Sequence, residues 1–275
     1  MATSRTLSTR IWGTIRRVFP RCSMLSQAIA FNVFFAFFPT LLLAVGLASS
    51  WLGSRTALLD AIRDFTQFLP PGSQGIVAEF LHSRGDDVWK LALLGWIGTL
   101  LGGSQVMKYL MDGIHLIYDD DEHIGFIHRQ LRGLLLLLIT FAPILIAGIL
   151  GVFGRPLRHW LTDHFGNRAF FSGMWLFFFP VVAMVLAMLA LTFLYWVARP
   201  KEQSLFDVLP GAMLATLLWW IVNVVFGFYV RRVPYSVVYG GLAAVIGLLI
   251  WMQISAVIVL LGAAWNAESA LSRRR

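Results

Sequence analysis

The chain has 275 residues, of which 58% are hydrophobic and only 13% are charged, and its mean hydropathy is +0.74. A water-soluble globular domain does not need so much apolar surface, so these values exclude that class and indicate a protein built for lipid. The net charge of +8 comes largely from basic residues near the ends of apolar runs, which favours anionic lipid headgroups as partners and not nucleic acid. Cys22 is the only cysteine, which excludes an intramolecular disulfide and a multi-cysteine metal site.

The N-terminal segment predicts an amphipathic helix that lies in the plane of the lipid headgroups. Over residues 9–21 one helical face is apolar, made of Ile11, Trp12, Ile15, Val18 and Phe19. The arginines of this segment lie largely elsewhere around the helix. The apolar run that follows is too long for a secretory signal. The pattern divides the chain into a basic cytoplasmic arm (1–26), a membrane domain (27–265) and a basic cytoplasmic tail (266–275).

Six apolar runs are close to or above the about 17–25 residues that cross a bilayer as a helix. These runs cover residues 27–52, 88–112, 132–153, 173–198, 208–230 and 240–265. The longest loop between them, 53–87, carries apolar residues at helical spacing on both sides of Pro70, which predicts short amphipathic helices on the bilayer surface. The sequence therefore predicts an all-α, polytopic membrane protein with six transmembrane helices.

The distribution of lysine and arginine predicts the orientation of these helices. With six spans both termini lie on one side, and that side receives 13 of the 22 basic residues against 9 on the other. Basic residues are retained preferentially in the cytoplasm, so we expect both termini to be cytoplasmic.

The stretch from Gln105 to His115 places four polar side chains along one helical stripe, because they are spaced by three or four residues: Gln105, Lys108, Asp112 and His115. Two interpretations stay open. The stripe is either a solvated interface, with Lys108 extended toward the headgroups, or part of a functional cavity. Lys108 and Asp112 are four residues apart, so we expect them to pair. Other polar candidates for lining such a cavity are Asn32, Asn223 and Tyr239.

No catalytic arrangement stands out. The consecutive residues Asp119 to His123 form an acidic loop, and side chains so close in sequence cannot all aim at one ion, so a solvated loop is favoured over a metal centre. The histidines show no ligand spacing. We therefore expect no enzyme activity, no metal and no cofactor.

Small residues and prolines mark expected packing positions. Gly211 and Ala215 have the spacing that lets two membrane helices approach closely. Pro39 lies inside the first span, where it removes a backbone donor and favours a kink. Gly240 and Gly241 stand where the chain enters the last span, so we expect close backbone approach or a special dihedral angle there.

Several motifs resemble the YihY/BrkB family of bacterial inner-membrane proteins. They are IAFNVFFAFFPT at 29–40, QFLPPG at 67–72, and PGAMLATLLWW and the following segments of the C-terminal third. The most specific part is Tyr235-x-x-x-Tyr239-Gly240, followed by the Leu260 to Ala263 run with Gly262, and by Asn266. The chain departs from the family pattern at Ala264, where a glutamate is frequent, and at His115, where an asparagine is frequent.

This resemblance covers nearly the whole chain and implies a six-span, mostly helical fold in the bacterial inner membrane. Family members carry the labels ribonuclease BN and virulence factor, and movement of lipids or lipid-like glycoconjugates is a function proposed for some of them. We expect a transporter or lipid exporter, with a structural or envelope-integrity protein as the alternative. A ribonuclease is the third and least favoured interpretation. The sequence carries no signal for the substrate or the oligomeric state.

Overall fold

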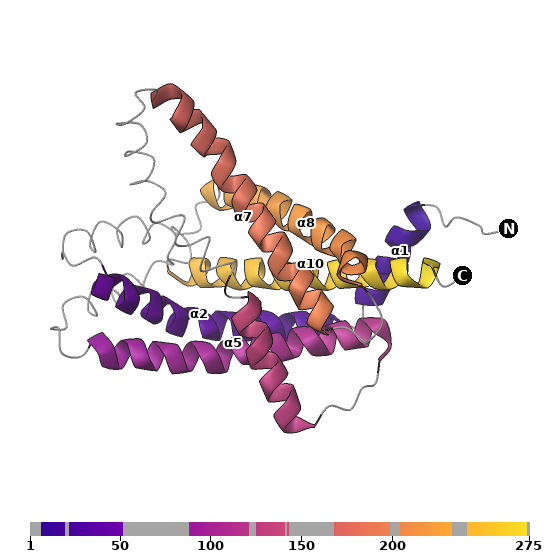
Figure 1. The fold of residues 1–275 in the computed structure, drawn as a ribbon, viewed down its shortest axis with the longest axis horizontal. Coiled ribbons are helices and arrows are strands. Elements are labelled where there is room, and N and C mark those ends of the chain that lie inside the picture. The colour runs from indigo at the N-terminus through magenta and orange to yellow at the C-terminus, as the bar shows by residue number, and fades with distance from the viewer. Residues whose placement is uncertain are drawn as a thin grey trace. The chain divides into compact units, whose positions relative to one another are not determined.

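The computed structural model describes residues 7–19, 22–51, 88–120, 125–140, 142, 168–198, 204–232 and 241–273. Within these ranges the chain is helical and contains no strand (Figure 1). The helices are α1 (Leu7–Val18), α2 (Ser23–Trp51), α5 (Val88–Tyr118), a helix over residues 126–140, α7 (Arg168–Ala198), α8 (Leu205–Arg232) and α10 (Gly241–Arg273). The all-α prediction is thus confirmed for the described part of the chain.

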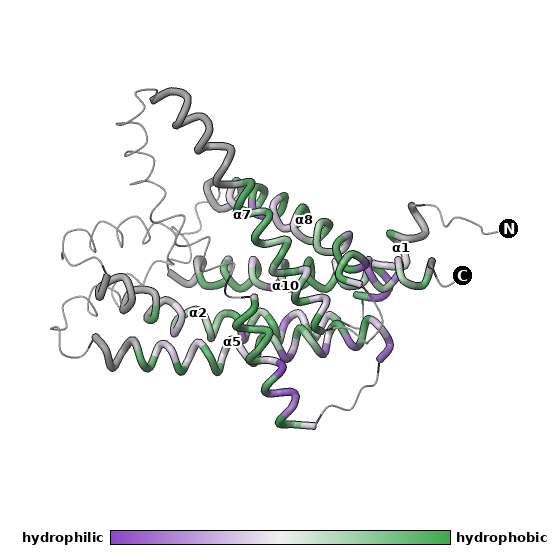
Figure 2. The backbone as a smooth tube through the Cα atoms, in the orientation of Figure 1, coloured by the Kyte–Doolittle hydropathy of each residue, from purple (hydrophilic) through white to green (hydrophobic). Residues whose placement is uncertain are grey.

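Four of these helices contain stretches that are long and apolar enough to cross a membrane: Ser23–Thr40, Val181–Ala198, Leu205–Phe228 and Val245–Leu271. Figure 2 shows these helices as mainly hydrophobic, whereas hydrophilic residues gather in α1, in the last turns of α5 and at the start of the 126–140 helix. The four stretches overlap the first, fourth, fifth and sixth predicted spans. The second predicted span is a continuous helix, α5, which is not among the four.

Several predicted features lie outside the described residues. These are most of the third predicted span beyond residue 140, the loop 53–87 with Pro70, and the motif residues Tyr235, Tyr239 and Gly240. Gly241 is the first residue of α10.

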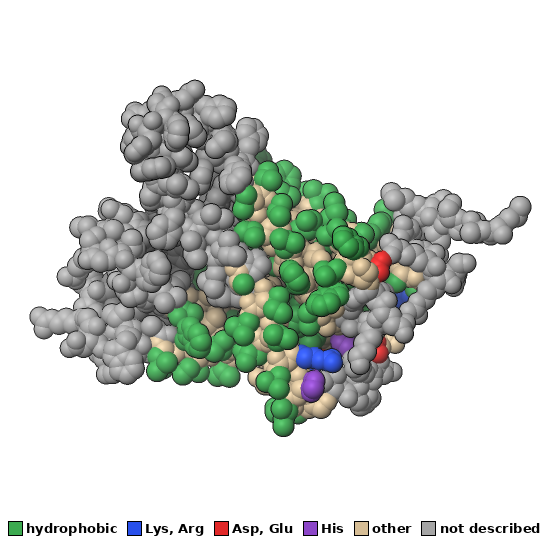
Figure 3. Space-filling view, in the orientation of Figure 1, with side chains coloured by type: hydrophobic (Ala, Val, Ile, Leu, Met, Phe, Trp, Pro, Cys, Tyr) green, Lys and Arg blue, Asp and Glu red, His purple; other side chains and the backbone are tan. Residues whose placement is uncertain are grey.

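The surfaces of the described helices carry many exposed large apolar side chains, including Phe31 and Phe35 on α2, Leu94 on α5 and Val225 on α8. Hydrophobic side chains cover most of the described part of the face in Figure 3. A contiguous apolar surface of this kind is unfavourable in water, so it marks a surface that another apolar phase covers. This is the expected surface of a helical membrane protein.

The chain forms two compact units. The first contains α1, the end of α5 from Met111, the 126–140 helix, α7, α8 up to Trp220 and α10 from Ile258; the second contains α2, the rest of α5, the end of α8 and the start of α10. In the second unit α5 packs closely against α2 around Pro39. A Cβ atom on Gly95 would lie 2.9 Å from the Pro39 carbonyl oxygen, and one on Gly98 would lie 2.7 Å from the Pro39 Cβ. The missing side chains therefore permit this contact.

In the first unit, α7, α8 and α10 meet through small residues and buried hydrogen bonds. A Cβ atom on Gly262 of α10 would lie 2.6 Å from the carbonyl oxygen of Gly211 on α8. The Tyr195 hydroxyl of α7 donates to the Val259 carbonyl oxygen of α10 at 2.6 Å. Asn266 accepts from the Gly211 N–H and donates to the Val208 carbonyl oxygen, both at 2.8 Å. These contacts fasten three helices into one core.

Candidate functional site

The candidate site begins at the C-terminal end of α5, where the helix closes in a specific way. Asp119 adopts a left-handed conformation with φ of 53°. The Asp120 N–H donates to the His115 carbonyl oxygen at 3.0 Å, and the Asp119 N–H to that of Leu116 at 3.3 Å. These two bonds form the Schellman arrangement, in which the residue after the helix turns left-handed; Asp tolerates this conformation better than most side chains. The closure stops α5 at Tyr118.

The predicted stripe of Gln105, Lys108, Asp112 and His115 lies on α5, and all four residues are partly buried. Asp112 belongs to the first unit, where its carboxylate accepts a hydrogen bond from the Arg129 guanidinium of the 126–140 helix, forming an ion pair. His115 Nδ1 lies 3.2 Å from Asp120 Oδ2, immediately beyond the helix end. Asp112 thus has a partner on a different helix, which the spacing along α5 cannot reveal.

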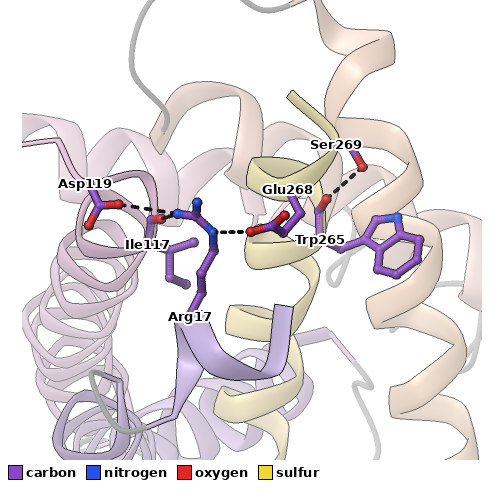
Figure 4. A network of polar contacts seen from close by, with 6 residues as sticks. All are labelled: Arg17, Ile117, Asp119, Trp265, Glu268 and Ser269. Atoms are coloured by element: carbon purple, nitrogen blue, oxygen red, sulfur yellow. Dashed lines mark hydrogen bonds and ion pairs between the residues drawn. The ribbon is translucent and has the colours of Figure 1, made fainter. Parts of the chain in front are cut away.

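Arg17 of α1 forms a second polar cluster at the same end of α5 (Figure 4). Its Nε donates to Glu268 Oε1 of α10 at 2.7 Å, and its Nη1 donates to the Ile117 carbonyl oxygen of α5 at 2.8 Å. The same Nη1 lies 3.5 Å from Asp119 Oδ2. Glu268 is only 6% exposed and the Arg17 side chain 21% exposed. We call this set of four residues the Arg17 clamp.

Electrostatics explain why an arginine occupies this position. The last carbonyl groups of a helix have no partner within the helix, and the aligned peptide dipoles make that end negative. The guanidinium is planar and carries several donors, so it reaches two acceptors from different helices at once. A buried carboxylate such as Glu268 is stable only when a cation compensates its charge. The clamp therefore joins α1, α5 and α10.

The other sequence candidates make contacts of a structural kind. Asn32 donates to the Ala28 carbonyl oxygen of its own helix at 2.8 Å. Asn223 of α8 accepts a hydrogen bond from Trp251 Nε1 of α10 at 3.0 Å. On α10, near Glu268, the Ser269 hydroxyl donates to the Trp265 carbonyl oxygen at 2.8 Å (Figure 4). The described residues thus place Asn32 and Asn223 in local and interhelical bonds, and Tyr239 lies outside them.

Sequence reasoning missed Arg17, Arg129 and Glu268. Of the three, Glu268 had the clearest sequence signal, because it is a single carboxylate at the end of a long apolar run, one helical turn after Ala264. Two of the clusters pair a carboxylate with an arginine, Asp112 with Arg129 and Glu268 with Arg17. Within the described residues no group of three or more potential ligands is placed to hold a metal ion.

Comparison with known proteins now places the chain in a family. The sequence profile described as virulence factor BrkB matches residues 18–275. The chain belongs to the BrkB family. This assignment agrees with the resemblance carried by the sequence motifs, and it makes the long apolar helices those of an integral membrane protein.

Relatives of this BrkB-family chain include the ribonuclease-like protein YfkH of Bacillus subtilis, 29% identical over 244 residues, with 88% of each chain covered. UPF0761 membrane proteins of Alkalilimnicola ehrlichii and Aromatoleum aromaticum are each 27% identical, over 92% and 90% of this chain. This chain spans 57% and 60% of the length of those two proteins. No solved structure matches the sequence.

Proposed function

We propose that the protein is a non-enzymatic, multi-pass protein of the bacterial inner membrane that moves a lipid-like amphiphilic substrate. The observation that carries this proposal is the set of partly buried, ionisable side chains in the C-terminal half of α5, a helix of 31 residues that corresponds to the second predicted span. On insertion scales Lys or Asp costs about 2.5–3.5 kcal/mol at the centre of a span and less toward its end, so ionisable residues on such a helix usually face a pathway or a partner. A polar headgroup is the chemistry that this stripe suits.

The proposal includes the full topology predicted from the sequence. It has six spans, an amphipathic N-terminal helix at the bilayer surface and short amphipathic helices in the 53–87 loop. Both termini lie in the cytoplasm, because six spans put them on one side and the basic residues favour that side. The family assignment and four span-length helices support this arrangement. Anionic headgroups are the proposed lipid partners, because basic residues dominate the predicted cytoplasmic side.

Cysteine accessibility tests the pathway. After Cys22→Ser removes the only cysteine, Gln105→Cys is compared with Leu101→Cys, an exposed position one turn away on α5. Thiols react as thiolates, which form in water, so a charged thiol reagent should modify position 105 quickly and position 101 slowly. Equal, slow modification at both positions would contradict a hydrated pathway on this helix.

Reconstitution tests the substrate class. Purified protein in liposomes should accelerate the exchange of a fluorescent anionic phospholipid between leaflets, measured as loss of fluorescence after an external reductant is added. Asp112→Asn should slow that exchange, whereas Leu101→Ala on the apolar surface should not. Modification at position 105 without lipid exchange would support a transporter but would contradict anionic phospholipid as its substrate.

The alternative is a structural or envelope-integrity protein without a transport cycle. The fastened contact of α7, α8 and α10 favours it, because the Gly211–Gly262 approach and the Asn266 and Tyr195 hydrogen bonds resist relative motion of these helices. Absence of both lipid exchange and reactivity at position 105 would support this alternative.

A ribonuclease, the activity to which the name of the ribonuclease-like protein YfkH refers, is disfavoured. Phosphodiester hydrolysis needs convergent carboxylates for a metal ion, or a base beside a nucleophile. Glu268 and Asp112 instead carry ion pairs with arginines.

A further inference from the structure

The helix α1 has two faces of opposite character. Four large apolar side chains are exposed, Ile11, Trp12 and Ile15 on α1 and Phe19 in the turn directly after it, and Trp12 is 67% exposed. At about 100° per residue they cover roughly 100° of the helix circumference. Arg16, also exposed, continues this arc next to Trp12. The helix therefore presents an apolar strip with a cation at its edge.

The rest of the circumference of α1 packs against protein. Thr14 and Val18 are buried, and Arg17 reaches the Glu268 carboxylate and the Ile117 carbonyl group. A Cβ atom on Gly13 would lie 3.0 Å from Glu268 Cδ, so the absence of a side chain at position 13 lets α1 approach α10 closely. The Arg17 clamp thus fixes the rotation of α1 about its axis and turns the apolar strip away from the protein.

Sequence distance fixes where this strip lies relative to the membrane. Only residues 19–22 separate the end of α1 from Ser23, the first residue of a span-length apolar stretch. Four residues extend over at most about 15 Å. A helix that ends so few residues before a span can reach the bilayer surface and its lipid phosphates.

We infer that α1 is a preformed docking surface for anionic phospholipids. Ile11, Trp12, Ile15 and Phe19 enter the boundary between headgroups and acyl chains, and Arg16 binds a lipid phosphate. The Arg17 clamp acts as the positioning element, because it orders the helix before lipid binds. The two neighbouring arginines have different roles: Arg16 binds the lipid phosphate, and Arg17 holds α1 against the protein. This inference rests on the proposed membrane placement.

Lipid contact is measured in nanodiscs made from zwitterionic phosphatidylcholine, with or without anionic phosphatidylglycerol. In the Cys22→Ser background, a fluorophore is attached at Trp12→Cys and its quenching by spin-labelled lipid is recorded. Phe35→Cys, exposed on the span-length part of α2, serves as the control for membrane placement. We expect quenching at both positions. Quenching at 35 but not at 12 would overturn the inference and leave α2 as a membrane span, whereas no quenching at 35 would overturn the membrane placement of α2 itself.

The role of Arg16 is tested by lipid charge. The attraction of one arginine to an anionic surface raises the ratio of docked to undocked helix about fivefold. Arg16→Gln should therefore reduce the quenched fraction at position 12 in anionic nanodiscs and leave it unchanged in zwitterionic ones. High salt should mimic this variant, because screening shortens the range of the attraction. Equal effects in both lipids would overturn anionic recognition.

The role of Arg17 is tested by the buried face. Thr14→Cys should be protected from a thiol reagent in the otherwise unchanged protein and should become reactive when Arg17→Met is added. Arg17→Lys keeps the charge but loses the two-acceptor geometry, so it should give intermediate reactivity and replaces Arg17→Met if that variant does not fold. Unchanged protection in either folded variant would overturn the positioning role.

Discussion

Removing Arg17 should destabilise the protein strongly, although this arginine lies on a short helix near the N-terminus. Arg17→Met leaves the carboxylate of Glu268, only 6% exposed, without its cation. Breaking a buried ion pair by deleting one partner costs about 3–5 kcal/mol, because the remaining charge stays in a medium of low dielectric constant. Both side chains are less than a third exposed, so solvent screening reduces this value only slightly.

The double variant separates the charge effect from the lost hydrogen bond. When Glu268→Gln is added to Arg17→Met, no uncompensated charge remains, and the cost should fall. The remaining cost is the loss of the Arg17 donor at the Ile117 carbonyl group, which is about 1–3 kcal/mol for a buried acceptor. The double variant should therefore be more stable than the Arg17→Met single variant.

Thermal unfolding in detergent, followed by the fluorescence of the 11 tryptophans, provides the measurement. At about 2–4 °C per kcal/mol, Arg17→Met should lower the melting temperature by roughly 6–20 °C. Asp119→Asn is the matched control: Asp119 is 60% exposed and 3.5 Å from Arg17, so its loss should cost less than about 1 kcal/mol. If the effects of Arg17→Met and Glu268→Gln simply add, the pair is not coupled and the clamp argument fails.

Three further predictions follow from the topology and the packing. In a cysteine-free background, Ser73→Cys should be labelled by an impermeant thiol reagent in intact cells and Ser204→Cys only after permeabilisation; the reverse pattern would contradict the orientation. A double-mutant cycle on Asp112 and Arg129, which are 35% and 43% exposed, should give a coupling of at most about 1 kcal/mol in thermal unfolding, and a larger value would mean that this pair is shielded from solvent. Gly262→Ala should lower stability by about 1–3 kcal/mol, because its Cβ would meet the Gly211 carbonyl group, and a melting temperature equal to that of the unchanged protein would refute the close contact.

Long apolar runs were sufficient to predict the helical fold. A run of about 20 apolar residues has few alternatives to a helix in lipid, so α2, α7, α8 and α10 followed from composition and length. The α5 helix was also predicted, although Gln105 and Lys108 make it less apolar than the others. Helical periodicity likewise placed the four stripe residues on one helix.

The partners of polar side chains could not be predicted in the same way. Periodicity reports neighbours three or four residues apart on one helix, whereas Arg17 and Glu268 are separated by 251 residues. Their contact depends on how closely α1 approaches α10, which the missing side chain of Gly13 permits. The same reason explains why spacing along α5 did not suggest Arg129 as a partner of Asp112; the pairing of Lys108 with Asp112 stays a prediction.

Two of the long-range polar contacts share one feature: a side chain of one helix binds backbone groups of another helix. Arg17 binds the Ile117 carbonyl group at the end of α5, and Asn266 binds the backbone of α8 on both sides of Pro210, which itself has no donor. Within lipid there is no water to bind such groups, so the protein supplies the partners itself. The positions of Arg17 and Asn266 are thus explained by the backbone groups that these side chains bind. Among the described contacts the Asp112–Arg129 pair binds no backbone group, so these two side chains are the first to test in transport.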